Sequence, residues 1–200
     1  MHIIIQAAIL RTFPGDPGTL SLYTPAHGRL IVSDARRRTA RSACIVGDIG
    51  HATLASSGGQ WFLQQFESLV TQPKMSNSDI FFWRNHLLDI YFFYVPLCQP
   101  NEGLFALLVQ TLRTENAPPL LFKLFITHFF CLQGYHVPED VRWYRPLLAQ
   151  ALETHPFVLH AEPEAELSLD VWLKATVVQH NHFQYLKTHH FLPQLYSTVG

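Results

Sequence analysis

The residues of this chain most able to do chemistry are arginines gathered near its N-terminus. Five of the ten arginines fall within residues 25–41, where a short apolar run at 30–32 is followed almost at once by a basic cluster. A guanidinium donates two parallel hydrogen bonds and therefore matches a phosphate. We expect these arginines to contact nucleic acid, the alternative being a solvated loop kept soluble by its charge. They are Arg29, Arg36, Arg37, Arg38 and Arg41.

Charge is distributed unevenly along a chain whose net charge is only −1 over 200 residues. Residues 1–70 carry six arginines against four acidic residues, whereas residues 71–200 carry eight basic against eleven acidic residues. A basic first part and an acidic remainder favour one domain that binds an anion and another that does not. The hydrophobic content of 48% against 14% charged residues predicts a sizeable core.

The sequence offers little for catalysis or for a metal. The G-x-S-x-G and G-x-x-x-x-G-K-[ST] patterns are absent, as are C-x-x-C and H-E-x-x-H. The histidine clusters have no carboxylate nearby, so we predict no metal, no cofactor and no catalytic residue. The acidic run at 162–170 is interpreted as a solvated loop. The histidines in question are His180, His182, His189 and His190.

Three well-separated cysteines, Cys44, Cys98 and Cys131, do not form a disulfide framework. They are expected to be buried free thiols in a reducing cytoplasm. The apolar run at 80–97 contains Arg84, which a bilayer would bury at high cost, so it predicts a core helix and no membrane contact.

Residues 1–70 have the pattern of β structure. Short apolar or alternating runs are separated by turn residues, and a closed barrel is the simplest arrangement for them. The strands are expected at 3–10, 19–24, 30–33, 44–46, 52–55 and 61–66.

The remainder has helical periodicity with recognisable ends. Asn101 is placed to cap one helix, Pro118-Pro119 to open the next, Gly134 to end it, and Ser168 to cap a later one. The helices are expected at 80–94, 102–113, 120–133, 146–153, 169–180 and 183–192.

Several segments together resemble the RecO DNA-repair proteins, the recombination mediators. The similar segments are AILRTFP at 8–14, LSLYTPAHGRL at 20–30, ARRR at 35–38 and LQGY at 132–135, with a weaker match at 185–192. Two departures stand out. The cysteine zinc module that many members carry after Gly-Tyr is missing, with residues 136–167 in its place, and His189 and His190 replace basic residues.

The resemblance implies an α+β protein, and the missing cysteines predict that it lacks the zinc module. Residues 1–72 would form an OB-fold nucleic-acid-binding barrel, and residues 73–200 an α-helical domain.

The resemblance also implies a non-enzymatic, cytoplasmic and nucleoid-associated function. The protein would bind single- and double-stranded DNA, anneal complementary strands and help to load recombinase onto strands coated by single-stranded-DNA-binding protein. The implied partners are RecR, the C-terminal tail of single-stranded-DNA-binding protein and, indirectly, RecA. Lys123, a cation among apolar residues, would receive that tail, and Arg11 would extend the DNA-binding set of Arg29, Arg36, Arg37, Arg38 and Arg41.

Other interpretations stay open. The chain could be a protein-interaction scaffold that does not bind DNA by itself, which the acidic back part favours, or an enzyme that uses the histidine clusters. The aromatic residues of the first part could stack on unpaired bases or simply form the core. Those residues are Phe13, Tyr23, Trp61 and Phe62.

Overall fold

The computed structural model describes residues 2–13, 15–34, 45–70, 78–114, 118–153 and 159–179, together with Leu186 and Tyr196. Cys44, at the start of one predicted strand, and nearly all of the helix predicted at 183–192 lie outside these ranges.

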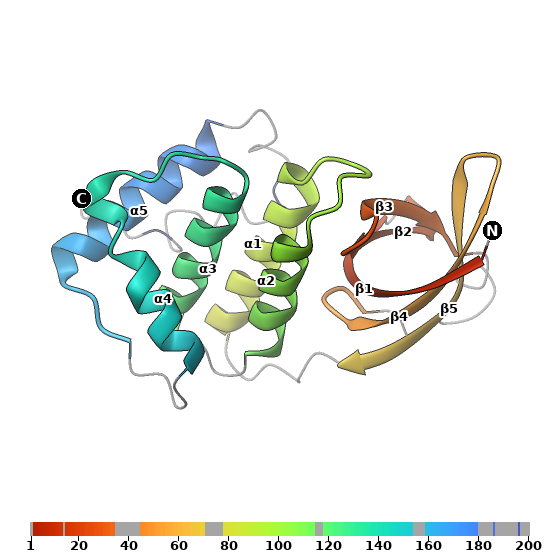
Figure 1. The fold of residues 1–200 in the computed structure, drawn as a ribbon, viewed down its shortest axis with the longest axis horizontal. Coiled ribbons are helices and arrows are strands. Elements are labelled where there is room, and N and C mark those ends of the chain that lie inside the picture. The colour runs from red at the N-terminus through yellow and green to blue at the C-terminus, as the bar shows by residue number, and fades with distance from the viewer. Residues whose placement is uncertain are drawn as a thin grey trace. The chain divides into compact units, whose positions relative to one another are not determined.

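The first part of the chain is a five-stranded sheet, so the protein is mixed α+β as predicted (Figure 1). The sheet closes on itself in the order β1-β2-β3-β5-β4. All pairings are antiparallel except that of β3 with β5, which runs through Val32 opposite Trp61 and Ser33 opposite Phe62. The strands are β1 (His2–Phe13), β2 (Asp16–Thr24), β3 (Gly28–Ser33), β4 (Ile49–Ser57) and β5 (Gln60–Val70).

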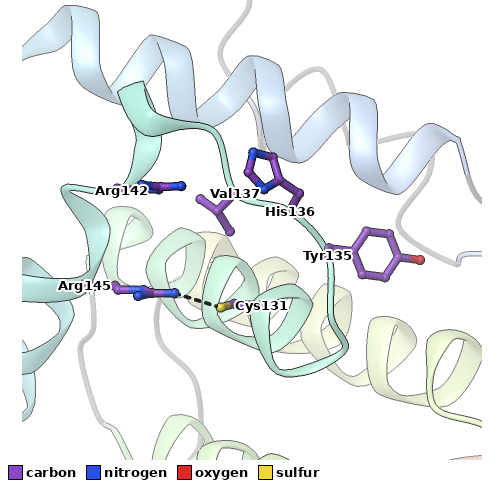
Figure 2. A pocket seen from close by; sticks show the side chains of 6 residues that line it. All are labelled: Cys131, Tyr135, His136, Val137, Arg142 and Arg145. Carbon is purple, nitrogen blue, oxygen red and sulfur yellow. Dashed lines mark hydrogen bonds between the residues drawn. The ribbon is translucent and has the colours of Figure 1, made fainter.

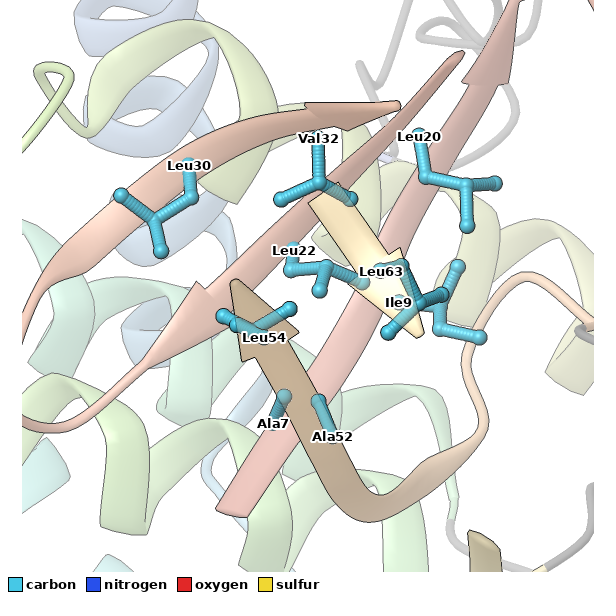
Figure 3. Packing of buried hydrophobic residues seen from close by; sticks show 9 residues of the cluster. All are labelled: Ala7, Ile9, Leu20, Leu22, Leu30, Val32, Ala52, Leu54 and Leu63. Carbon is cyan, nitrogen blue, oxygen red and sulfur yellow. The ribbon is translucent and has the colours of Figure 1, made fainter. Parts of the chain in front are cut away.

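The barrel core follows from the two-residue period of its strands. Alternate side chains of a strand point to the same face, and four strands each place an apolar pair at that spacing inside the barrel. Figure 3 shows these side chains meeting across the interior. The buried cluster is Ala7, Ile9, Leu20, Leu22, Leu30, Val32, Ala52, Leu54 and Leu63.

The strand predicted at 44–46 is wrong for its described residues. Ile45 and Val46 belong to a turn, because the amide of Asp48 donates to the Ile45 carbonyl at 3.0 Å and the Asp48 carboxylate accepts from the Ile45 amide at 3.3 Å. Gly47, at φ 92°, supplies the left-handed backbone of this turn. Val46 packs against the barrel core whereas Ile45 is exposed, so this apolar pair reflects the burial of Val46 rather than strand pairing.

Five of the six predicted helices are present, with shifted ends, and the sixth, at 183–192, lies almost wholly outside the described residues. The helices are α1 (Ser78–Tyr94), α2 (Glu102–Arg113), α3 (Pro119–Leu132), α4 (Tyr144–Glu153) and α5 (Pro163–Val178), with a 3₁₀ turn, η2 (Glu139–Val141). Asn101 caps α2 as expected, since its side-chain oxygen accepts from the Leu104 amide at 3.0 Å. Gly134, at φ 86°, follows the end of α3.

The acidic run is not the solvated loop that the sequence predicted. α5 begins at Pro163 rather than near Ser168, because proline suits the first helical position and the acidic side chains of Glu164 and Glu166 favour the first turn.

Two compact units make up the chain. One comprises residues 1–74 together with 88–113, and the other comprises 75–87 together with 114–200. The division passes through α1, so the second part of that helix and all of α2 belong with the barrel strands.

Within the first unit, helical residues cover the outer side of β2. Tyr23 is fully buried; its ring lies 5.7 Å from that of Tyr91 and 6.1 Å from that of Phe105, between centroids. The Tyr23 hydroxyl donates to the Asn101 carbonyl at 3.3 Å. β2 is therefore buried on both faces.

The second unit buries polar side chains with partners. Arg84 donates to the Thr114 carbonyl at 2.8 Å, and the His86 ring lies 2.7 Å from the Tyr196 hydroxyl. Burial lowers the pKa of His86 to about 3, so this ring is neutral at pH 7. Among the described residues, no helix combines the length and apolar character that crossing a bilayer requires.

Gly28 gives a direct test of the packing in the first unit. It has φ 67°, and a Cβ there would lie 2.1 Å from the Gln99 carbonyl oxygen. We expect Gly28→Ala to lower the free energy of unfolding by about 3 kcal/mol. The matched control is Gly58→Ala, at φ 58° but in open space, which should cost only about 1 kcal/mol. Urea unfolding would measure both, and equal losses would contradict the close approach of residue 99.

Candidate nucleic-acid interface

Most of the predicted arginine cluster falls in one connection. Arg36, Arg37, Arg38 and Arg41 lie outside the described residues, in the segment that joins β3 to β4. Their contacts are therefore not part of the geometry that follows, which concerns Arg29 and Arg11.

Arg29 anchors the end of α1 to β3. Its Nε donates to the Val95 carbonyl at 2.8 Å, and its guanidinium carbon lies 4.9 Å from the centroid of the Phe92 ring. The Arg29 carbonyl accepts from the Cys98 amide at 3.0 Å. Burial lowers the pKa of the Arg29 guanidinium, although the Cys98 thiol partly opposes this. Arg29 is therefore a structural cation with part of its hydrogen-bonding capacity already used.

Arg11 reaches the same aromatic group from β1. Its guanidinium carbon lies 4.7 Å from the centroid of Phe92 and 5.1 Å from that of Phe93. The Arg11 Nε and Nη1 atoms are buried without a hydrogen-bond partner. Cation–π attraction holds the group in place. It does not use these two donors, which are shielded from solvent.

The structure thus brings Arg11 and Arg29 together on one phenylalanine ring. Among the residues that the structure describes, neither arginine forms an ion pair with a carboxylate. Phe92 and Phe93 were not identified as site residues from the sequence. They look like ordinary core positions of a helix, and nothing in their own pattern links them to arginines so distant in the chain.

The aromatic residues considered for base stacking divide into three groups. Tyr23 is buried and cannot reach a base. Phe13 packs edge-to-face on Phe92 with centroids 5.9 Å apart. Trp61 is half-buried, and its ring centroid lies 5.4 Å from that of His27 in the β2–β3 turn. Phe62 is also half-buried. Trp61 with His27 is the better-placed surface for stacking.

Lys123 is buried and paired with two carboxylates, unlike the accessible cation expected for binding a partner's tail. Only 3% of it is exposed, and its Nζ lies 2.7 Å from Glu166 Oε1 and 2.7 Å from Asp170 Oδ1. Two carboxylates already neutralise the ammonium. A partner's carboxylate would have to displace them, so the structure gives Lys123 a role in joining α3 to α5.

The cysteines differ from the expected buried thiols. Cys98 is exposed and Cys131 is partly exposed, while Cys44 lies outside the described residues. His180, His182, His189 and His190 also lie outside them. Within the described ranges, no three His, Cys, Asp or Glu side chains are grouped to hold a metal ion.

No protein-family model matches the chain, and a search of the curated proteins finds no match to it.

The Lys123 ion pairs lead to a stability prediction. Lys123→Ala leaves the buried Asp170 carboxylate without its cation, so we expect the free energy of unfolding to fall by about 3–5 kcal/mol. The double variant Lys123→Met/Asp170→Leu removes both charges and should recover most of that loss. Urea unfolding of the three proteins would measure this. A Lys123→Ala protein as stable as the wild type would contradict the structural role.

Proposed function

We propose that the five-stranded barrel is an OB-fold and that the protein is a non-enzymatic DNA-binding mediator of recombinational repair. It would bind single- and double-stranded DNA and anneal complementary strands. The observation that carries the proposal is a closed five-stranded barrel whose β3–β4 connection contains four arginines.

The strand order supports the OB-fold assignment. An OB-fold is a five-stranded Greek-key barrel that binds oligonucleotides. The order β1-β2-β3-β5-β4, with β3 and β5 as the one parallel pair among the described strands, gives a barrel of this kind. Barrels of this type bind single strands by combining a positively charged groove with stacking aromatic rings.

Two sets of cations supply the positive charge. The connection between β3 and β4 carries Arg36, Arg37, Arg38 and Arg41, and Arg11 lies on β1 with donors unused. Neutralising phosphates releases counterions, which drives binding at low salt without reading sequence. Arg29 contributes charge to this surface while it also holds the helical residues in place.

Because the outer side of β2 is covered, bound DNA would have to lie on another part of the barrel. OB-folds commonly bind along the β2–β3 face. Here Ser21 and Tyr23 of β2 are buried, whereas Ile31 and Ser33 of β3 remain exposed. We therefore place the interface on the exposed outer face of β3 and on the β3–β4 connection, with Trp61 of the neighbouring β5 as the stacking ring.

Annealing by such a surface needs no catalytic group. Arginines neutralise two polyanions so that they can approach, and base pairing supplies the free energy. Loading of RecA onto strands coated by single-stranded-DNA-binding protein, together with RecR, would follow from this activity. Because Lys123 is neutralised by Glu166 and Asp170, the proposal assigns the tail of single-stranded-DNA-binding protein no site on that residue.

The salt dependence of binding to a fluorescent single-stranded oligonucleotide tests the proposal. Each phosphate contact contributes a slope of about −0.7 in log K against log[salt]. If Arg29, Arg36, Arg37, Arg38 and Arg41 all contact phosphates, the slope is about −3.5, and Arg36/Arg37/Arg38→Ala should reduce its magnitude by about 2.

The control variant is Arg113/Arg142/Lys174→Ala, which removes the same charge from helical segments and should leave the slope almost unchanged. If both triple variants lose the same slope, binding is diffuse and the assigned surface is wrong. If the wild type does not bind at low salt, a scaffold without autonomous DNA binding becomes the better interpretation.

A further inference from the structure

The second unit contains a pocket that the proposed DNA-binding function does not use. Its volume is about 380 Å³, within the range of small-ligand sites. Figure 2 shows its lining, which comes from the end of α3, the segment after it and the start of α4. The lining residues are Cys131, Tyr135, His136, Val137, Arg142 and Arg145.

Two arginines line this pocket together with the thiol of Cys131, and one of them contacts the sulfur. Arg145 Nη2 donates to Cys131 Sγ at 3.4 Å, drawn as a dashed line in Figure 2. Arg142 and His136 line the same space. Glu139 Oε1 lies 3.4 Å from Arg142 Nη1, but this pair is exposed and weak. Among the described residues, no carboxylate forms an ion pair with Arg145.

The electrostatics of Cys131 favour its thiolate. Burial alone would raise the pKa of this thiol. Hydrogen bonds from Tyr144 and Arg145 and the charge of Arg145 outweigh that effect and lower it below its ordinary value. The α3 carboxyl end, where Cys131 lies, would disfavour an anion, so the lowering comes from α4.

The other titratable groups around Cys131 are consistent with this assignment. His128, one turn earlier on α3, has its pKa lowered by burial and by the charge of Arg145, which keeps the ring neutral at pH 7. Burial raises the pKa of Tyr144, so its hydroxyl stays protonated and available to donate. Arg145 is therefore the charge that both stabilises the thiolate and faces an incoming anion.

We propose that Cys131 is a site of reversible thiol–disulfide exchange that selects small, carboxylate-bearing disulfides through the cations of its pocket. The Cys131 thiolate attacks one sulfur of the disulfide, a new S–S bond forms, the original S–S bond breaks, and the departing sulfur leaves as a thiolate. Electrons balance within this exchange, and a free thiol reverses it. Partial exposure next to cations is the setting in which reactive cysteines are found.

The selectivity is measured as the rate of reaction with an anionic disulfide divided by the rate of reaction with a neutral one. The Cys44→Ser/Cys98→Ser protein keeps Cys131 alone, and Cys44→Ser/Cys131→Ser keeps the exposed Cys98, which is near Arg29 but outside the pocket, for comparison. Each is reacted with the dianionic disulfide 5,5′-dithiobis(2-nitrobenzoate) and with neutral 4,4′-dithiodipyridine. We expect the ratio to be about tenfold higher for Cys131 than for Cys98, because a cationic pocket concentrates anions.

Substitution of the cation separates selectivity from simple accessibility. Arg145→Gln in the protein that keeps Cys131 should bring the ratio down to that of Cys98 and move the pH midpoint of reactivity upward. Arg145→Lys should retain much of the preference. Glutathione disulfide, followed by mass spectrometry, should then modify Cys131 in preference to Cys98 in the wild-type chain.

Two results would overturn the assignment. One is the same anionic-to-neutral ratio for Cys131 and Cys98. The other is a ratio that Arg145→Gln leaves unchanged while circular dichroism shows a folded protein. Neither depends on DNA binding, so the proposed function and this inference fail or succeed separately.

Discussion

The contact between Arg29 and the end of α1 is the constraint on which the first unit depends. One residue of β3 donates to the Val95 carbonyl, accepts from the Cys98 amide and lies over the Phe92 ring. This fixes the chain that follows α1 against the barrel, and the close approach of Gln99 to Gly28 continues the same contact. Residues 88–113 then cover β2, and Tyr23 becomes a core residue. The nucleic-acid interface that we propose for the barrel therefore lies elsewhere than on that strand.

The second unit depends on a comparable use of charge. Lys123 joins α3 to α5 through Glu166 and Asp170, in a setting where replacement by matched apolar residues would be tolerated but removal of one partner would not. On the opposite end of α3, Arg145 meets a thiol instead of a carboxylate. In one case two anions satisfy the cation completely. In the other the cation faces an open pocket. Arg145 can therefore attract an incoming anion, whereas Lys123 cannot.

The sequence predicted the element types well because they depend on local patterns. The two-residue alternation at Leu20 and Leu22 and the cap at Asn101 need only near neighbours. The segments that were predicted wrongly make contacts with residues far away in the sequence. Ile45 is exposed and only Val46 packs on the barrel core, so this apolar run is not a strand. The acidic run belongs to a helix that begins at Pro163, and its Glu166 and Asp170 meet Lys123 of another helix. Phe92 could not be linked to Arg11 and Arg29 without the tertiary fold.

We propose that single-stranded DNA binds to the exposed outer face of β3 and to the β3–β4 connection. Amide hydrogen–deuterium exchange of the full chain, with and without a saturating single-stranded oligonucleotide, tests it most directly. The account predicts slower exchange in peptides that cover residues 31–48, with little change in 118–153. Protection confined to 118–153, or none anywhere in the chain, would contradict it.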